Sequence, residues 1–325
     1  MMNTLTQMPE VVALLQGSDR PLLLAHPRPD GDAIGSVLAL RLALLQLGKS
    51  PLVACIHPAP DTFAYLPGHA EFVQTLPPDA GIDLVVAVDQ SDLRRTGGLY
   101  PESWRGVIPL AVIDHHETND AFGDANLVVG DAAATAVVMT DVIAALGVPL
   151  TPDIATCLLT GILGDTRGLR TDNTTPDVLA LVTHLMAAGG DYHTAMREGL
   201  DVVPYIHMRA WGIALNNLRL EDGLAWTTLN LEDKAALDIA DHEDIDLGNL
   251  INHTREARVI AVFIEMRDGT VKVSLRSRGS VNVAGVAKMF AGGGHQQAAG
   301  FSVAGPLDVA TATALPPVRA LLSGF

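Results

Sequence analysis

Residues 110–117 read Leu-Ala-Val-Ile-Asp-His-His-Glu, an apolar run of strand type that delivers a carboxylate and two imidazoles at its end. Polar groups that emerge from a buried strand need partners that offset their desolvation. A metal ion supplies such partners to Asp114, His115 and His116. Alternatively, the three residues occur together by chance, and their side chains are structural or merely solvated. The triplet alone therefore does not decide the function.

An upstream apolar run ends in the same way. Residues 22–25 (Leu-Leu-Leu-Ala) lead into His26-Pro-Arg-Pro-Asp30-Gly-Asp32, and an apolar helical pattern follows directly. The glycine between the two aspartates permits a tight fold that aims both carboxylates at one point. A purely structural interpretation makes Asp32 the N-cap of the helix and Asp30 a turn residue.

A third apolar run, residues 84–88, ends in Asp89. This repetition predicts an open α/β sheet of mainly parallel strands, whose ligands bind outside the carboxyl ends of the strands. A fourth carboxylate fits the pattern, because the helical stretch 154–163 is followed by Gly164 and Asp165. The helix dipole disfavours a carboxylate at that end, so a cation partner would explain Asp165, and a plain surface aspartate is the alternative.

Five motifs, in this order, resemble those of the DHH/DHHA1 phosphoesterases: HPRPDGDAIGS (26–36), VDQSD (88–92), DHH (114–116), GILGDT (161–166) and GGGHQQAAGF (292–301). The length and the last motif are most similar to the oligoribonuclease and 3′-phosphoadenosine-5′-phosphate phosphatase group, often called nanoRNases. The resemblance covers nearly the whole chain. It implies an α/β fold: an N-terminal DHH domain with a mainly parallel sheet flanked by helices, a smaller α/β DHHA1 domain, and an active site in the interdomain cleft.

The resemblance also implies a role for each site residue. The implied metal ligands are His26, Asp30, Asp32, Asp89, His115 and Asp165, with Asp89 bridging two ions. Asp114 would orient a histidine, and His116 would lie beside the scissile phosphate and donate a proton to the leaving oxygen. Two divalent ions about 3.5–4 Å apart activate a water and stabilise charge during in-line displacement. Four carboxylates with two imidazoles favour Mn²⁺, and Co²⁺, Fe²⁺, Mg²⁺ and Zn²⁺ remain open.

The second half of the chain has its own organisation. Short strands begin near residue 225, and Arg267-Asp268-Gly269 is typical of a hairpin turn between strands at 258–266 and 270–276. We therefore expect three segments, a DHH catalytic domain (1–190), a helical linker (191–215) and a DHHA1 substrate-binding domain (216–325).

The last motif and the strand before it predict the substrate-binding residues, which are Arg276, Ser277, Arg278, Gly293, Gly294 and His295. Arginine suits bidentate phosphate binding, and a glycine triplet lets a substrate approach the backbone, although a lone triplet is more often a flexible turn. The fourth motif departs from the family pattern by reading Asp-Thr-Arg-Gly. Arg167 there, and Arg94 and Arg95 after the second motif, are left open between phosphate contacts and solvated side chains.

Charge and composition restrict the substrate. The net charge is −16, yet residues 250–300 hold seven basic and three acidic side chains, a local balance of +4, so the remainder carries −20. A protein that tracks long nucleic acid needs an extended basic surface, and an aromatic content of 4% offers few stacking platforms. Short single-stranded oligonucleotides or nucleotide bisphosphates are the expected substrates.

Composition also bounds the cellular setting. Cys55 and Cys157 lie in apolar contexts without a CxxC pattern, so we expect buried free thiols in a reducing compartment. The sequence shows no signal peptide and no membrane span, which predicts a cytoplasmic protein without a membrane partner. The resemblance implies a homodimer.

The function implied by the resemblance is hydrolysis of short oligoribonucleotides and linear dinucleotides to mononucleotides, from the 5′ end, with removal of the 3′-phosphate of 3′-phosphoadenosine-5′-phosphate. A RecJ-type exonuclease would need further nucleic-acid-binding modules, and a membrane-bound cyclic-dinucleotide phosphodiesterase would need sensor and transmembrane segments. A family II pyrophosphatase would carry a Ser-Arg-Lys-Lys type motif in place of Gly-Gly-Gly-His. A non-catalytic RNA-binding protein would keep six ligands without using them.

Overall fold

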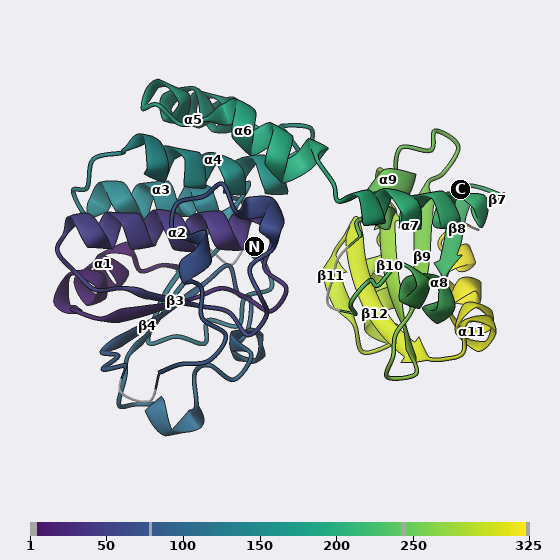
Figure 1. The fold of residues 1–325 in the computed structure, drawn as a ribbon, viewed down its shortest axis with the longest axis horizontal. Coiled ribbons are helices and arrows are strands. Elements are labelled where there is room, and N and C mark those ends of the chain that lie inside the picture. The colour runs from purple at the N-terminus through teal and green to yellow at the C-terminus, as the bar shows by residue number, and fades with distance from the viewer. Residues whose placement is uncertain (1–4, 78–79, 242–244, 323–325) are drawn as a thin grey trace. The chain divides into compact units, whose positions relative to one another are not determined.

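The structure of the chain, a computed structural model, describes residues 5–77, 80–241 and 245–322. It divides into two compact units, Met1–Val203 and Pro204–Phe325 (Figure 1). The first unit ends with α6 (Tyr192–Met196) and the π-helical turn Arg197–Asp201, and the second begins with α7 (Tyr205–Asn216). Among the described helices, none has the length and apolar character needed to cross a membrane.

A six-stranded sheet of order β1-β6-β5-β4-β2-β3 forms the centre of the first unit. Its β1–β6 pair is antiparallel and its other described pairs are parallel, which confirms the mainly parallel sheet. The central strands are buried along their whole length, as expected for parallel strands covered on both faces. The strands are β1 (Leu5–Thr6), β2 (Pro21–Leu24), β3 (Leu52–Ala54), β4 (Leu84–Val88), β5 (Leu110–Asp114) and β6 (Ala125–Val128).

The two faces of this sheet are covered differently. Val86 and Val88 of β4 pack into a core with the long helices, whereas Val85 and Ala87 pack into a second core with loops and short 3-10 turns. Cys55 and Cys157 are buried and free, which confirms their expected state. The helices are α1 (Met8–Gly17), α2 (Gly31–Gln46), α3 (Thr135–Ala145), α4 (Pro152–Asp165) and α5 (Pro176–Ala187), and Figure 1 shows α2, α3 and α4 together over one face.

The second unit is a sheet of order β11-β12-β10-β9-β8-β7, in which β8 and β9 are parallel and the other described neighbours antiparallel. The predicted hairpin is confirmed, because β9 and β10 pair antiparallel around a turn closed between Met266 and Thr270. One face packs on α10 and α11, and the other on α7 and α9. Its elements after α7 are β7 (Arg219–Glu221), β8 (Leu224–Leu229), α8 (Leu231–Ala236), α9 (Leu247–Ile251), β9 (Val259–Glu265), β10 (Thr270–Ser277), α10 (Ala284–Met289), β11 (Gly293–His295), β12 (Ala298–Ala304) and α11 (Leu307–Ala320).

The last two glycines of the triplet lie in an edge strand and not in the flexible turn that a lone triplet favours. Gly293–His295 is β11, which pairs with β12. A Cβ added at Gly292 would lie 2.3 Å from the carbonyl oxygen of Gly300, and one at Gly294 would lie 2.4 Å from that of Ala298. These two glycines are therefore needed for close approach between backbones, whereas a Cβ at Gly293 would meet no atom within 4 Å.

Candidate metal centre

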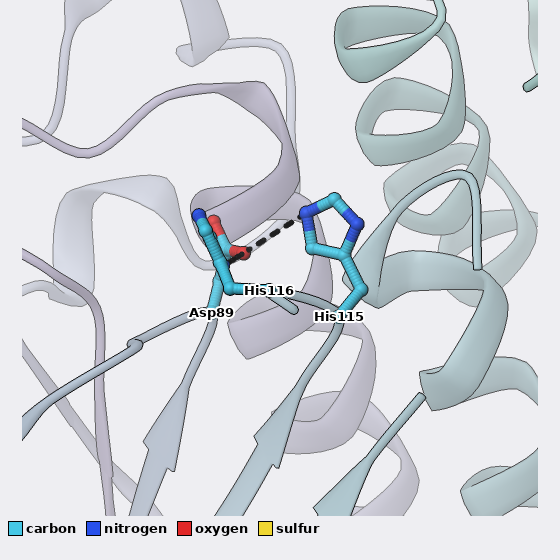
Figure 2. A group of neighbouring side chains, drawn as sticks. All are labelled: Asp89, His115 and His116. Atoms are coloured by element: carbon cyan, nitrogen blue, oxygen red, sulfur yellow. Dashed lines mark ion pairs between the residues drawn. The ribbon is translucent and has the colours of Figure 1, made fainter. Parts of the chain in front are cut away.

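The carboxyl ends of three parallel strands place the first ligand-type side chains of the site. His26 follows β2, Asp89 follows β4, and His115 and His116 follow β5. Residues Leu24 and Ala87, and then Val88 and Ile113, are opposite each other in the sheet, so the strands end nearly level. Figure 2 shows Asp89 and the two histidines turned toward one another at this edge. Asp89 has a φ of 59°, a left-handed conformation that aspartate tolerates and that is frequent at functional positions.

Two clusters share Asp89 and therefore place it between two potential ion sites. In the first, Nε2 of His26 lies 3.4 Å from Oδ2 of Asp89 and 3.7 Å from Oδ1 of Asp30. In the second, the other oxygen of Asp89, Oδ1, lies 3.7 Å from Nε2 of His115 and 3.6 Å from Nδ1 of His116. Each carboxylate oxygen of Asp89 thus faces a different group of imidazoles.

The third cluster joins His115 to carboxylates from two helices. Nε2 of His115 lies 3.1 Å from Oδ2 of Asp165, at the end of α4, and 4.0 Å from Oδ2 of Asp32, in the first turn of α2. The structure therefore brings all six proposed ligands into overlapping clusters. Asp165 has an imidazole partner here, and the unfavourable position at a helix C-terminus is offset.

The roles that a purely structural interpretation gives to Asp30 and Asp32 are wrong. Asp30 is the N-cap of α2, and its Oδ1 accepts from the backbone N–H groups of Asp32 and Ala33. Asp32 instead accepts from the N–H groups of Thr135 and Ala136, so it caps α3, a helix more than 100 residues further along the chain. Asp30 and not Asp32 is the N-cap, because α2 already begins at Gly31.

A buried network holds the strand ends in register. Asp114 is fully buried, its Oδ1 lies 2.7 Å from Nδ1 of His116, and its Oδ2 accepts from the amide of Asn119 at 2.6 Å. The same amide donates to the carbonyl oxygen of Gln90, whose side chain donates in turn to the carbonyl oxygen of Leu24. The network therefore ties the ends of β2, β4 and β5 together and fixes the orientation of His116.

Electrostatics favour a cation in this site. Burial lowers the pKa of His26, but Asp30 and Asp89 outweigh this effect and raise the pKa to about 10. Burial raises the pKa of Asp32 well above its usual range, and the charges of Asp165 and Asp89 add to the increase. Without an ion the cluster thus holds protons that compensate its carboxylates. A divalent cation would displace these protons and take over the same compensation.

The donor set fits divalent ions. Carboxylate oxygens and imidazole nitrogens are the ligands of Mn²⁺, Fe²⁺, Co²⁺ and Zn²⁺, and Mg²⁺ prefers oxygen. In two of the proposed histidine ligands, the Nδ1 atom already has a hydrogen-bond partner. Nδ1 of His26 lies 3.0 Å from the carbonyl oxygen of Pro27, and Nδ1 of His115 lies 3.1 Å from that of Ala132. These contacts leave Nε2 of each ring for an ion, the arrangement typical of metal-binding histidines.

The substrate-binding residues proposed from the sequence lie in the second unit, where β10 separates them by face. Arg276 is on one face, and its Nε donates to Oδ1 of Asn249 at 3.0 Å. Ser277 is on the other, buried, and its hydroxyl donates to the carbonyl oxygen of Val281. The structure therefore does not bring Ser277 to the face of Arg276. Arg278 follows the strand, and its backbone N–H donates to the carbonyl oxygen of Arg258.

The edge of the second sheet brings the remaining residues near Arg276. Arg276 and His295 are opposite the same residue, Ala298, on the two sides of β12. Gly294 pairs with Ala299, and Gly293 pairs with Gly300. The side chain of His295 lies outside what the structure describes.

Three arginines were left open by the sequence. Arg94 is exposed, and its guanidinium pairs with Asp92 at 3.2 Å. Arg95 is in the same 3-10 turn, and its backbone N–H donates to the carbonyl oxygen of Asp92. Arg167 follows the end of α4 with a φ of 49°. The structure assigns none of the three to a phosphate.

Four positioning groups escaped the sequence analysis: Ser36, Gln90, Asn119 and Thr135. Ser36 donates to Oδ1 of Asp32 and lies four residues after it in the same helix. That spacing is a signal that the sequence contains. Thr135 reaches Asp89 only through the tertiary fold, because 46 residues separate the two. Asn119 lies five residues after its partner Asp114, but its contact with Gln90, 29 residues before it, also depends on the fold.

Comparison with known proteins defines the class. A model of the DHH family N-terminal domain matches residues 22–162, and a model of the DHHA1 domain matches residues 206–315. An exopolyphosphatase-related protein from Bacteroides fragilis has the same fold, with a TM-score of 0.87, 22% identity and 97% of each chain covered. The RecJ structure from Thermus thermophilus matches more loosely, with a TM-score of 0.55, 16% identity, and coverage of 100% of this chain and 56% of RecJ. Fold and motifs together define a DHH-type phosphoesterase.

Sequence relatives place the chain within that class. It is 37% identical to the bifunctional oligoribonuclease and PAP phosphatase NrnA of Thermus thermophilus, over 95% of this chain and 92% of the relative. The NrnA of Bacillus subtilis is 25% identical, over 90% of this chain and 92% of the relative. The chain belongs to the DHH/DHHA1 phosphoesterase family that contains these enzymes.

Proposed function

We propose that this phosphoesterase hydrolyses short oligoribonucleotides and linear dinucleotides to mononucleotides, from the 5′ end, and removes the 3′-phosphate of 3′-phosphoadenosine-5′-phosphate. The observation that carries the proposal is the set of three overlapping clusters, in which Asp89 and His115 are each shared by two. A shared carboxylate can serve two adjacent ions, as Asp89 would here. His115 offers a single lone pair at Nε2, so it joins the second and third clusters into one ion site. The names of the Thermus and Bacillus relatives supply the substrate class.

The metal ligands of the proposal are His26, Asp30, Asp32, Asp89, His115 and Asp165, with Asp89 shared between two ions. When bound, two divalent ions supply Lewis acidity toward the phosphoryl oxygens and lower the pKa of a water. We take Mn²⁺ as the resident ion, because a mixed carboxylate and imidazole set suits it better than Mg²⁺.

The protein contributes proton control and positioning. Asp114 accepts the Nδ1 proton of His116, which leaves Nε2 of that ring to exchange a proton with the leaving oxygen. His116 itself is partly exposed, so a substrate has access to it. In the second unit, Arg276 and Arg278, the N–H groups of Gly293 and Gly294, and His295 are the proposed contacts to the terminal phosphate or nucleotide.

Residues 250–300 carry a net charge of +4, and the rest of the chain is acidic. This distribution of charge favours a short anionic substrate over a long nucleic-acid strand. We expect the enzyme to act in the cytoplasm as a homodimer, and sedimentation velocity of the purified protein tests the dimer.

The decisive experiment follows end-labelled RNA from dimers to decamers, together with 3′-phosphoadenosine-5′-phosphate, in the presence of Mn²⁺ and after chelation. We expect rapid cleavage of the shortest oligomers, slower cleavage as length increases, and release of phosphate from the bisphosphate. Preference for long single-stranded DNA would instead support the RecJ-type alternative. No hydrolysis of any phosphodiester by the metal-loaded protein would leave only a binding role.

A further inference from the structure

Thr135, the first residue of α3, contacts two of the proposed ligands at once. Its side chain is fully buried. Its hydroxyl donates to Oδ1 of Asp89 at 2.9 Å, and its backbone N–H donates to Oδ2 of Asp32 at 2.6 Å. Asp89 comes from the end of a strand and Asp32 from the start of another helix, so a single residue connects ligands on two separate elements.

The hydroxyl of Thr135 is not required by its own helix. Other buried threonines in helices of this unit bond a carbonyl oxygen four residues back: Thr140 bonds that of Ala136, and Thr160 bonds that of Thr156. Thr135 also does not cap α3 with its side chain, because Asp32 accepts the first N–H groups of that helix. Its hydroxyl therefore has one described partner, the carboxylate of Asp89.

We propose that Thr135 is a positioning residue for the metal centre, and that its hydroxyl fixes the rotation of the Asp89 carboxylate so that each oxygen serves a different ion. Oδ1, which accepts from Thr135, faces His115 and His116, and Oδ2 faces His26. A carboxylate oxygen has two lone pairs, so Oδ1 keeps one for an ion while it accepts from the hydroxyl.

This inference rests on the proposed two-ion site and adds a specific requirement to it. Without the hydroxyl, the carboxylate of Asp89 is free to rotate. An ion bound at one site then no longer orients the other oxygen of Asp89 for the second ion. Loss of a partner that orients a metal ligand typically reduces metal affinity about 10- to 100-fold. We expect that reduction for at least one of the two ions, with a loss of communication between them.

The test compares Thr135→Ser with Thr135→Ala, which lack the same methyl group and differ in the hydroxyl alone. Thr135→Val, of nearly unchanged volume, provides a second hydroxyl deletion should the alanine variant fold poorly. Thr140→Val is the matched control, because it removes a buried hydroxyl from the same helix without touching a ligand. Mn²⁺ binding is measured by calorimetry, and electron paramagnetic resonance distinguishes a coupled pair of ions from isolated ones. Thermal unfolding of the ion-free proteins reports the fold.

We expect Thr135→Ser and Thr140→Val to bind a coupled Mn²⁺ pair as the wild type does. Thr135→Ala and Thr135→Val should show weakened binding and the spectrum of isolated Mn²⁺, while their ion-free unfolding stays close to that of their controls. Wild-type affinity and coupling in both hydroxyl deletions would overturn the role of Thr135 alone. Absence of any ion pair in the wild type would overturn the proposed function first.

Discussion

Asp89 is the residue on which the site depends most, because its two oxygens face separate groups of imidazoles. We predict that Asp89→Asn reduces hydrolysis by more than about 100-fold. Loss of a residue that only orients a metal ligand typically costs about 10- to 100-fold. The amide cannot bridge two cations, although it can still accept from Thr135. The amide has nearly the same shape as the carboxylate, so the ion-free protein should stay folded.

The measurement is turnover of a dinucleotide together with metal content after dialysis. Asp92→Asn serves as the control, since Asp92 follows the same strand but caps a 3-10 turn and pairs with Arg94. A folded Asp89→Asn protein that keeps both bound metal and activity would contradict the shared-ligand assignment.

Asp114 acts one step further from the ions, through His116. We predict that Asp114→Asn lowers kcat about 10- to 100-fold and leaves metal content largely intact, because the histidine loses the partner that orients it but the proposed ligands remain. Steady-state kinetics with metal analysis checks this. A loss of metal equal to that of Asp89→Asn would show that Asp114 supports the ligands directly.

At the scale of elements, the close packing of α2 on α4 brings Asp32 and Asp165 to the same point. A Cβ at Gly35 would lie 2.3 Å from the carbonyl oxygen of Cys157, and one at Gly161 would lie 2.6 Å from Oδ1 of Asp32. The glycines thus permit a close contact between the helices, and this contact includes an oxygen of the proposed ligand Asp32. The stability of this contact and the geometry of the ligands cannot be changed independently.

We therefore predict that Gly161→Ala lowers the free energy of unfolding by about 1–3 kcal/mol, the usual cost of overpacking, and also weakens Mn²⁺ binding. Gly212→Ala in α7, where an added Cβ meets no atom within 4 Å, should instead stabilise by up to about 1 kcal/mol through helix propensity. Denaturant unfolding and metal titration measure both effects. Equal stability of the two variants would refute the packing argument.

Strands that appear in the sequence as apolar runs with polar residues at their ends could be predicted, and so could the ligands that follow them. Asp89 and His115 come after uniformly apolar strands, and parallel strands bring such residues together. Thr135 could not be found, because its partner depends on how α3 is placed against the sheet. The composition of the glycine triplet favours a flexible turn, but Gly292 and Gly294 are needed for close contact with the neighbouring backbone, a feature visible only in three dimensions.

At the scale of the whole molecule, ion binding should be coupled to folding. An ion that binds only the folded protein stabilises it by about 2.7 kcal/mol at a concentration 100 times its dissociation constant. We predict that chelation abolishes hydrolysis and lowers the melting temperature, and that added Mn²⁺ restores both. Asp89→Asn should show a much smaller shift. An unchanged melting temperature of active protein after complete removal of metal would contradict this coupling.

The two units should also divide the work between chemistry and substrate binding. The proposed ligands all lie in the first unit, whereas Arg276 lies in the second, on the face of β10 opposite to the buried Ser277. We predict that Arg276→Ala leaves metal content unchanged and lowers kcat/KM for a dinucleotide about 10- to 100-fold, as expected for loss of charge-assisted hydrogen bonds. Bis-p-nitrophenyl phosphate, which lacks a terminal phosphate and bases, should be far less affected. Arg267→Ala, at the hairpin turn of the same sheet, is the charge-matched control, and equal losses on both substrates would mean that Arg276 acts in the chemical step or the fold.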